Sequence, residues 1–217
     1  MEVYALLVSI VSLLVSSLIA YVAYFKPASI DMIVGKVISF YPLPEQVGTE
    51  VHWGGVAFHV PITFHNWSTK GGAIEEVRII LEHKGNPSQN YDMTWCTFTQ
   101  MHTEELRWVH KSVAQPIAVP GKGAVSEVVL FAWKKSAGQS LIIESGEYVL
   151  RVLAYQTGDR KPALKYENNF IVSNEIAKYH AGFLAKRQPY SIEVPLGESS
   201  RGNTVISREQ ARELYNI

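Results

Sequence analysis

The feature that most constrains this chain is an uncharged apolar stretch at its N-terminus. The 23 residues from Val3 to Phe25 contain no Asp, Glu, Lys or Arg. A helix of that length rises about 35 Å, enough to cover the roughly 30 Å hydrocarbon core of a bilayer. Tyr24 and Phe25 stand at its end, where aromatic rings favour the membrane interface, and Lys26 and Pro27 follow. We therefore predict a single transmembrane anchor over residues 1–26.

A cleaved signal peptide is the competing interpretation of this stretch. Such a peptide begins with basic residues, continues with an apolar run of about 7–15 residues and ends with small residues before the cleavage point. This chain begins Met1-Glu2-Val3, its apolar run is longer, and Leu18 and Ala20 make a poor cleavage pair. The sequence therefore favours an uncleaved signal-anchor. A signal peptide and a buried core helix are the alternatives.

The charges beside the span predict its orientation. Lys26 and Lys36 lie on its C-terminal side, whereas the short N-terminal tail carries Glu2. Under the positive-inside rule this favours a domain that faces the cytoplasm. The single cysteine, Cys96, suits a reducing compartment and excludes an internal disulfide, so the fold must rest on its apolar core.

Small residues line one face of the predicted span. They recur at spacings of three or four, which places them on one side of a helix: Ala5, Ser9, Ser12, Ser16 and Ala20. Such a row lets two membrane helices approach closely, because no bulky side chain separates their backbones. It predicts a homo-oligomer formed through the anchor. The alternative is that Ser and Ala are simply common in single spans.

Replacing Ser12 and Ser16 by Leu tests this pairing. Two bulky side chains on the small face should keep the helices apart and lower self-association in a membrane reporter assay. The control is Leu7→Ile combined with Leu14→Ile, because these two residues lie on the opposite side of the helix. An unchanged signal in the Ser12→Leu, Ser16→Leu variant would dispose of the pairing.

Composition excludes some partners. The chain has 217 residues, 47% hydrophobic and 18% charged, which is enough apolar material for a core. Lys plus Arg and Asp plus Glu each total 20, so the formal net charge is zero. A nucleic-acid partner would require a basic excess, and none is expected.

From Ser29 onward the dominant periodicity is that of β-strands. In the clearest strand, Val56 to Trp67, the residues Val60, Ile62 and Phe64 share one face, and the histidines His59 and His65 share the other. We predict seven to nine short strands, an antiparallel immunoglobulin-like β-sandwich over residues 27–195. The other strand-like stretches are Ile30 to Val34, Val37 to Tyr41 (stopping at Pro42-Leu43-Pro44), Glu76 to Leu81, Tyr91 to Gln100, Ile117 to Val119, Val125 to Trp133, Tyr148 to Tyr155 and Ala163 to Val172, while Glu104 to Lys111 fits either a strand or a helix.

Two helical patterns come late in the chain. An apolar stripe at helical spacing predicts a helix packed on the sandwich, or a basic helix lying on the membrane surface: Ile176, Tyr179, His180, Phe183 and Leu184. Residues 196–217 read as a polar linker followed by a short helix. That helix would open with the capping box Ser207-Arg208-Glu209-Gln210.

Three segments together carry a resemblance. They are the span ending Tyr24-Phe25-Lys26-Pro27, the strand and turn Val60-Pro61-Ile62-Thr63-Phe64-His65-Asn66 with Gly72-Ala73-Ile74 and Val77, and Ser145-Gly146-Glu147-Tyr148-Val149-Leu150-Arg151-Val152. With them the chain resembles uncharacterised prokaryotic single-pass membrane-anchored β-sandwich proteins of the immunoglobulin-like kind. The resemblance covers most of the chain and implies the fold. It brings no activity with it.

Few residues suggest chemistry. His59 and His65 are six residues apart, about 20 Å along a strand, so one metal ion cannot bridge them. Copper-type ligands occur in the order Cys96, Met101, His102, His110, which differs from the Cys, His, Met order of type-1 sites, and we expect no metal and no cofactor.

Catalytic motifs are weaker still. There is no G-x-S-x-G elbow, since Ser145 and Ser199 fall in a predicted turn and linker, and Cys96 fits an inert apolar thiol. The acidic pairs Glu75-Glu76 and Glu104-Glu105 are interpreted as solvated surface, because neighbours on a strand point to opposite faces.

Three further local patterns have ordinary explanations. Gly121-Lys122-Gly123 fits a hairpin turn better than a phosphate loop, and Asn66-Trp67-Ser68 matters as a glycosylation acceptor only in a secretory lumen. Core packing is the expectation for the tryptophans in strand-like runs, which are Trp67, Trp95 and Trp133.

The sequence therefore favours a non-enzymatic, membrane-tethered sandwich that binds another protein, or serves as an accessory subunit of a membrane complex. Sandwiches do this through an exposed sheet edge or through their end loops. The alternative is an extracytoplasmic domain that binds a carbohydrate or a metal, or that acts as a hydrolase.

Overall fold

The computed structural model describes residues 2–21, 28–102, 104, 107–134 and 141–197. It confirms a mainly β chain with an apolar N-terminal helix and few helices. The strands are β1 (Ile30–Val34), β2 (Val37–Val47), β3 (Glu50–Asn66), β4 (Gly72–His83), β5 (Asn86–His102), β6 (Arg107–Val113), β7 (Ile117–Val119), β8 (Ala124–Trp133), β9 (Gly146–Gln156), β10 (Leu164–Val172) and β11 (Ile192–Pro195). The predicted C-terminal helix lies outside the described residues.

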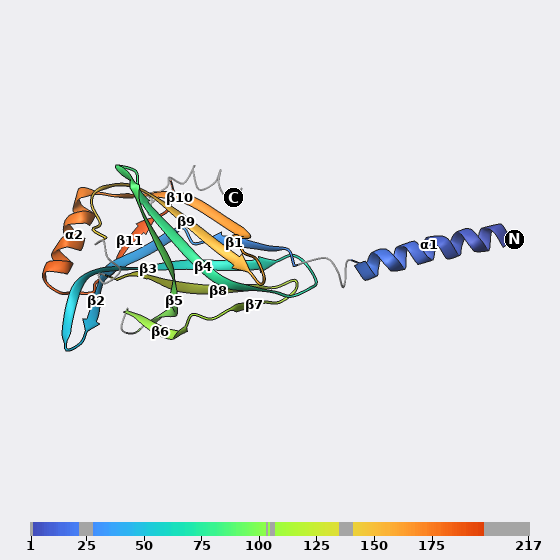
Figure 1. Cartoon of the computed structure of the whole chain (residues 1–217), viewed down its shortest axis with the longest axis horizontal. Coiled ribbons are helices and arrows are strands. Elements are labelled where there is room, and N and C mark those ends of the chain that lie inside the picture. Colours follow the sequence, from blue (N-terminus) through green and yellow to red (C-terminus); the bar gives the residue numbers. More distant parts are fainter. Residues whose placement is uncertain (1, 22–27, 103, 105–106, 135–140, 198–217) are drawn as a thin grey trace, which may run out of the picture.

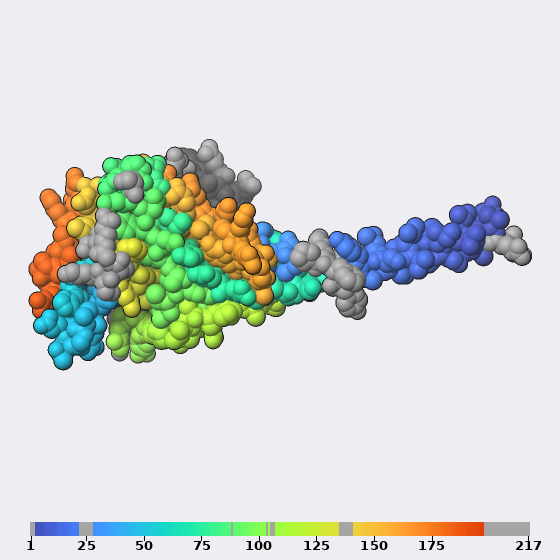
Figure 2. All heavy atoms as spheres, in the orientation of Figure 1, coloured from blue at the N-terminus to red at the C-terminus, as the bar shows by residue number. Residues whose placement is uncertain are grey.

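The N-terminal helix α1 (Glu2–Ala20) stands apart from the β-domain (Figures 1 and 2). The window Val3–Ala20 is long and apolar enough to cross a membrane, and none of it is buried within the protein. The hydroxyl of Ser9 donates a hydrogen bond of 2.9 Å to the carbonyl oxygen of Ala5, one turn earlier. This bond satisfies the serine within its own helix, as an apolar surrounding requires.

The strands form two stacked layers that share β5. Every strand pair is antiparallel. The first half of β5 pairs with β4, and its second half, from Trp95, pairs with β8 and β6. We call the layer β6-β5-β8-β3-β2-β11, with β1 beside β3, sheet A, and the layer β10-β9-β4-β5, with β7 beside β4, sheet B.

The core lies between the two sheets. Sheet A contributes Phe40, Phe58 and Phe131, and sheet B contributes Ile79 and Leu150, all of them fully buried. The face of β3 predicted from its alternation is therefore the core face, since the whole even-numbered series is buried there: Phe58, Val60, Ile62 and Phe64. With no disulfide available, this apolar burial is the main source of stability.

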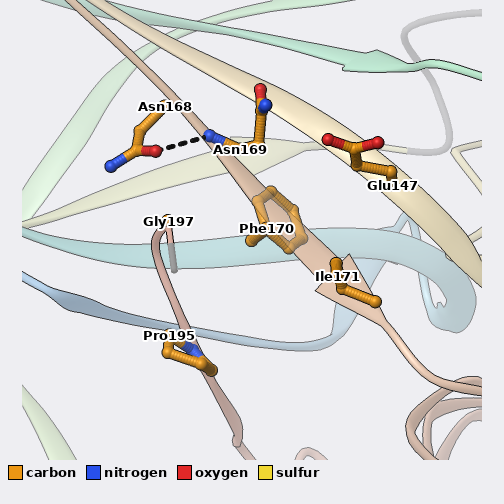
Figure 3. Close-up of a pocket in the computed structure, with 7 residues that line it drawn as sticks. All are labelled: Glu147, Asn168, Asn169, Phe170, Ile171, Pro195 and Gly197. Atoms are coloured by element: carbon orange, nitrogen blue, oxygen red, sulfur yellow. Dashed lines mark hydrogen bonds between the residues drawn. The ribbon is translucent and has the colours of Figure 1, made fainter. Parts of the chain in front are cut away.

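The two free ends of the strand order, β10 and β11, come close to closing the sheet. The amide of Gly197, just after β11, donates a 2.6 Å hydrogen bond to the carbonyl of Asn169 in β10. A hollow of about 640 Å³ lies beside this contact (Figure 3). Gly197 has φ +73°, and a side chain there would approach the Asn168 amide at 3.0 Å, so the crossing favours glycine.

The prediction that a strand stops at Pro42 is wrong. β2 continues through both prolines to Val47, and Pro42 pairs with Val56 of β3. Its other neighbour, β11, reaches only as far as Phe40. Beyond that point none of the described strands lies beside this edge of β2, and proline is tolerated where its missing N–H faces no acceptor.

Two further predictions are resolved by the pairing. The ambiguous stretch near residue 107 is a strand, β6, which pairs with β5. The hairpin predicted around Gly121 is wrong, because β7 pairs with β4 and β8 pairs with β3. The turn at residues 120–123 therefore connects the two sheets.

The predicted late helix is α2 (Asn174–Ala185), and it packs on the sandwich. The hydroxyl of Ser173 caps it by accepting a hydrogen bond of 3.2 Å from the amide of Ile176. His180 is buried with its ring centroid 5.6 Å from that of Phe40 in β2. Tyr179 of the predicted stripe instead faces solvent.

Truncation of a buried isoleucine tests the assignment of the core. Ile79→Ala should lower the free energy of unfolding by about 2–5 kcal/mol, because it leaves a cavity between the sheets. The matched control is Ile33→Ala on β1, whose side chain is 60% exposed, and it should cost less than about 1 kcal/mol. Urea unfolding of both variants measures the difference, and equal losses would contradict the described core.

Candidate functional site

Three aromatic rings stack on the outer face of sheet A, the face turned away from the core. The ring centroid of His59 in β3 lies 5.3 Å from Tyr41 in β2 and 4.5 Å from Trp108 in β6, with interplanar angles of 24° and 25°. His59 is only 3% exposed as a result. The prediction that His59 lies on the outer face is confirmed. We expected its side chain to be exposed to solvent, however, and the structure shows that the neighbouring rings cover it.

A fold in the β5–β6 hairpin brings Trp108 to this position. In sheet A, β5 and β8 lie between β6 and β3, so a flat sheet would hold these strands about 14 Å apart. Pairing of β5 with β8 ends at Thr99, and Met101 pairs with Trp108 beyond that point. The end of the hairpin therefore folds over the outer face of the sheet.

Burial keeps the central imidazole neutral. It lowers the pKa of His59 from 6.5 to about 4. The Nδ1 atom lies 3.4 Å from the hydroxyl of Ser39, which is buried beside it. Burial also raises the pKa of the Tyr41 hydroxyl. At neutral pH the stack is therefore uncharged, and it offers aromatic faces rather than a charge.

A pocket of about 520 Å³ opens beside the stack, and we call it the aromatic pocket. Its floor comes from β2, β3, β5 and β8, and its walls are β6 and the connection from α2 to β11. The hydroxyl of Thr97 in its lining is buried and has no hydrogen-bond partner among the described residues. The lining residues are Tyr41, His59, Thr97, Thr99, Arg107, Trp108, Val109, His110, Leu130, Pro189, Tyr190 and Ser191.

A second hollow of about 360 Å³ continues from the aromatic pocket, because Thr99 and Trp108 line both. Met101 and Val128 add apolar surface to it. Lys111 crosses it to form an ion pair of 2.7 Å with Glu127. The two hollows together form a groove across sheet A with Trp108 at its middle.

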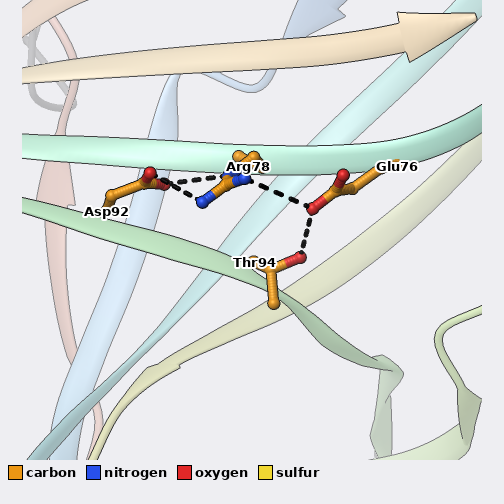
Figure 4. Close-up of polar contacts among 4 residues, drawn as sticks. All are labelled: Glu76, Arg78, Asp92 and Thr94. Carbon is orange, nitrogen blue, oxygen red and sulfur yellow. Dashed lines mark hydrogen bonds and ion pairs between the residues drawn. The ribbon is translucent and has the colours of Figure 1, made fainter. Parts of the chain in front are cut away.

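The outer face of sheet B has a different character. Arg78 donates two hydrogen bonds to Asp92, at 3.0 and 2.7 Å, while Glu76 accepts one from Thr94 (Figure 4). Arg151 likewise pairs with Glu82 and Glu167, each at 2.6 Å. These charges satisfy one another across neighbouring strands. The aromatic groove therefore distinguishes sheet A as the candidate binding face.

His59 and His65, which we considered together as metal ligands in the sequence analysis, lie far apart in the structure. His65 lies at the far end of β3, where its ring centroid is 3.9 Å from that of Trp67. No three His, Cys, Asp or Glu side chains come together as a metal site within the described ranges. Of the copper-type set only His110 lines the aromatic pocket, while Met101 lines the second hollow.

Other residues considered for chemistry lie apart from the pocket. Burial raises the pKa of the Cys96 thiol, which stays protonated and donates to the carbonyl of Thr94 at 3.6 Å. Glu75 is an exposed residue at a bulge in β4, and Glu76 faces Arg78. Ser199 and Glu105 lie outside the described residues.

The structure corrects one prediction about the tryptophans and shows where the glycosylation pattern lies. Trp67 is 60% exposed rather than part of the core, although Trp95 and Trp133 do pack against it. Asn66 of the glycosylation pattern is fully buried, and its side-chain nitrogen donates to the carbonyl of Lys70 at 2.9 Å. In the folded domain this amide is not accessible for modification.

No family model matches the chain, and no curated protein matches it. One similar solved structure is described as an X-ray structure of Northeast Structural Genomics Consortium target SoR45. It is 9% identical to this chain. The superposed region covers 83% of this chain and 95% of that chain, with a TM-score of 0.33. A likeness this weak carries no argument. The resemblance to anchored immunoglobulin-like sandwiches stays a prediction.

Acid should destabilise the domain through its buried histidines. Burial lowers the pKa of both His59 and His180 from 6.5 to about 4, so between these values the unfolded chain binds protons that the folded one does not. Stability is therefore complete above pH 6.5 and falls as the pH drops toward 4, by up to about 3 kcal/mol for each histidine.

Urea unfolding at several values between pH 7.5 and 4.5 measures this slope. His59→Gln and His180→Gln should each flatten it, because each variant removes one buried imidazole. The account of the two buried histidines is wrong if both variants keep the wild-type slope.

Proposed function

We propose that this chain is a membrane-tethered β-sandwich that binds another protein through the groove on sheet A, as an accessory subunit of a membrane complex. The observation that carries the proposal is the aromatic pocket, in which stacked rings lie beside the buried Thr97 hydroxyl, for which the described part of the chain supplies no hydrogen-bond partner. α1 supplies the tether. The proposal draws neither on a matched family nor on a catalytic motif.

The composition of the pocket suits a protein partner. Tryptophan, tyrosine and arginine carry most of the binding energy in protein interfaces, and Trp108, Tyr190 and Arg107 all line the pocket. Tyr190 is 57% exposed and so available for contact. An apolar or aromatic side chain seated between these rings would lose water on both faces.

The edge of β6 offers a way to hold such a partner. Four consecutive residues of β6 line the pocket, from Arg107 to His110, so the strand presents its edge as well as one face. Its described strand partner is β5 alone. An extended segment of the partner can add to this edge by backbone hydrogen bonds and place a side chain in the pocket.

The tether fits this role because it confines binding to partners at the same membrane. A second module held near its target binds it at an effective concentration set by the linker, commonly in the millimolar range. A groove of modest affinity then suffices for a stable complex. The proposal that the domain faces the cytoplasm continues to rest on Lys26 and Lys36.

A carbohydrate is the second candidate ligand. Flat aromatic faces beside hydroxyl groups suit a sugar ring, and Trp108 has Thr97 and Thr99 for neighbours in the pocket. This alternative requires the domain to lie outside the cell. A reporter fused after Ile217 that works only on the outer side would favour it.

Quantitative co-purification from native membranes tests the protein-binding proposal. Tyr190→Ala should weaken capture of the partner about tenfold, because it removes an exposed ring from the pocket without opening the core. Trp108→Ala should weaken capture further. The matched control is Tyr155→Ala on β9 in sheet B, which should capture as much as the wild type.

Each variant needs its free energy of unfolding measured alongside, since Trp108 also covers His59. Undiminished capture by a folded Tyr190→Ala variant would contradict the assignment of the groove. Loss of capture by Tyr155→Ala alone would move the interface to sheet B.

A further inference from the structure

The end of the sandwich next to α1 carries an exposed tryptophan and an excess of basic residues. We propose that this end docks onto the lipid headgroup surface, so that the domain rests on the membrane instead of swinging freely from its tether. This inference rests on the tether of the proposed function. It adds a second contact with the bilayer, made by the folded domain itself.

Three turns and the start of β1 form this end of the domain (Figure 1). The amide of Trp67 donates to the carbonyl of Ser29 at 2.9 Å, and the amide of Lys122 donates to the carbonyl of Ser68 at 2.7 Å. The amide of Thr157 donates to the carbonyl of Ala73 at 3.3 Å. The turns at 66–72, 120–123 and 157–163 therefore meet at one place, which we call the basal end.

The length of chain before β1 keeps the basal end close to the bilayer. Ala28 packs against Gly72 in the basal end. From Tyr21 to Ala28 there are seven residue steps, which span at most about 25 Å even when fully extended. The opposite end of the domain, at Gly48, is about 18 residues along β3 from Asn66, or nearly 60 Å. The basal end is therefore the part of the domain that lies nearest to the membrane.

Trp67 is held at the basal end with most of its ring in solvent. Its indole nitrogen donates a hydrogen bond of 2.6 Å to the carboxylate of Asp31, and its ring contacts His65. These contacts fix the ring without covering it, and 60% of the residue is exposed. An indole with one satisfied polar atom and a bare apolar face is well suited to the interfacial zone of a bilayer.

The charges of the basal end complement an anionic surface. The whole chain has 20 basic and 20 acidic residues. The three basal turns carry four cations and one anion, and all five residues are exposed: Lys70, Lys122, Arg160, Lys161 and Asp159. Asp31 at the start of β1 adds a second anion, which accepts the hydrogen bond of the Trp67 indole, so the basal end keeps a basic excess. Each basic side chain near an anionic leaflet contributes roughly 1 kcal/mol to binding. Trp67 and these cations therefore favour the same ligand, a bilayer that contains anionic lipid.

Docking in this pose keeps the proposed binding groove away from lipid. His59 pairs with Ser39, and Tyr41 pairs with Ala57, on either side of the Phe40–Phe58 pair, so His59 lies seven residues along β3 from Asn66. The aromatic pocket then stands roughly 20–25 Å above the headgroups. A partner anchored in the same membrane could reach it from the side.

Fluorescence quenching in nanodiscs tests the docking with the full chain. Cys96→Ala supplies a background without thiols, and a cysteine is introduced by Thr69→Cys in the basal end or by Thr49→Cys in the opposite β2–β3 turn. Each is labelled with an environment-sensitive dye in discs of phosphatidylcholine and phosphatidylglycerol that contain headgroup-labelled quencher lipids. Dye at position 69 should be quenched at least threefold more than dye at position 49.

Charge and ring variants then identify the contacts. Lys122→Glu combined with Lys161→Glu should reduce quenching at position 69 at least twofold, as should removal of phosphatidylglycerol. The matched control, Lys178→Glu on α2, should leave it unchanged. Trp67→Ala should reduce quenching even in discs of phosphatidylcholine alone.

The outcomes separate this inference from the tether. Equal quenching at the two positions in discs that hold the chain would overturn basal docking and leave the tether intact, whether the domain swings free or lies on its side. A chain that carbonate removes from membranes would overturn the tether, and the docking with it. Binding of a protein partner through the groove is measured separately, by the capture experiment with the Tyr190→Ala variant.

Discussion

The whole structure depends on burial of apolar side chains between two sheets that share one strand. Because the only cysteine is Cys96, no internal cross-link holds the layers together, and β5 joins them through its backbone. Phe58 and Phe131 of sheet A meet Ile79 and Leu150 of sheet B with no exposure to water. Once this core is formed, the second half of β5 is placed in sheet A, and the hairpin that follows it can fold over the outer face.

The candidate site follows from that fold. The hairpin carries Trp108 onto His59, and the ring excludes water from an imidazole that would otherwise be solvated. The result is an uncharged aromatic surface with a hollow on each side, on a domain whose other face carries paired charges such as Arg78 with Asp92. An apolar N-terminal helix, a groove and a basic end with Trp67 are the observations behind the proposal that this protein acts at a membrane by binding.

Much of this fold could be predicted from the sequence, because strand alternation and span length are local signals. The core face of β3 and the helix α2 follow directly from residue periodicity. What depends on distant residues could not be predicted. The cover over His59 comes from Trp108, 49 positions later, and the continuation of β2 through Pro42 depends on how far β11 extends along its other edge. Trp67 looked like a core residue because it follows an apolar strand. The turn after β3 instead places its ring at the surface.

A site-specific photocrosslinking map tests the central claim most directly. A photoreactive amino acid is placed at Tyr190 beside the aromatic pocket, or at Tyr155 on sheet B, in the full chain within its native membrane. The account predicts one discrete crosslinked protein from position 190, lost when Trp108 is replaced by Ala, and none from position 155. Crosslinking from position 155 alone, or none from position 190 in a chain that remains in the membrane, would contradict it.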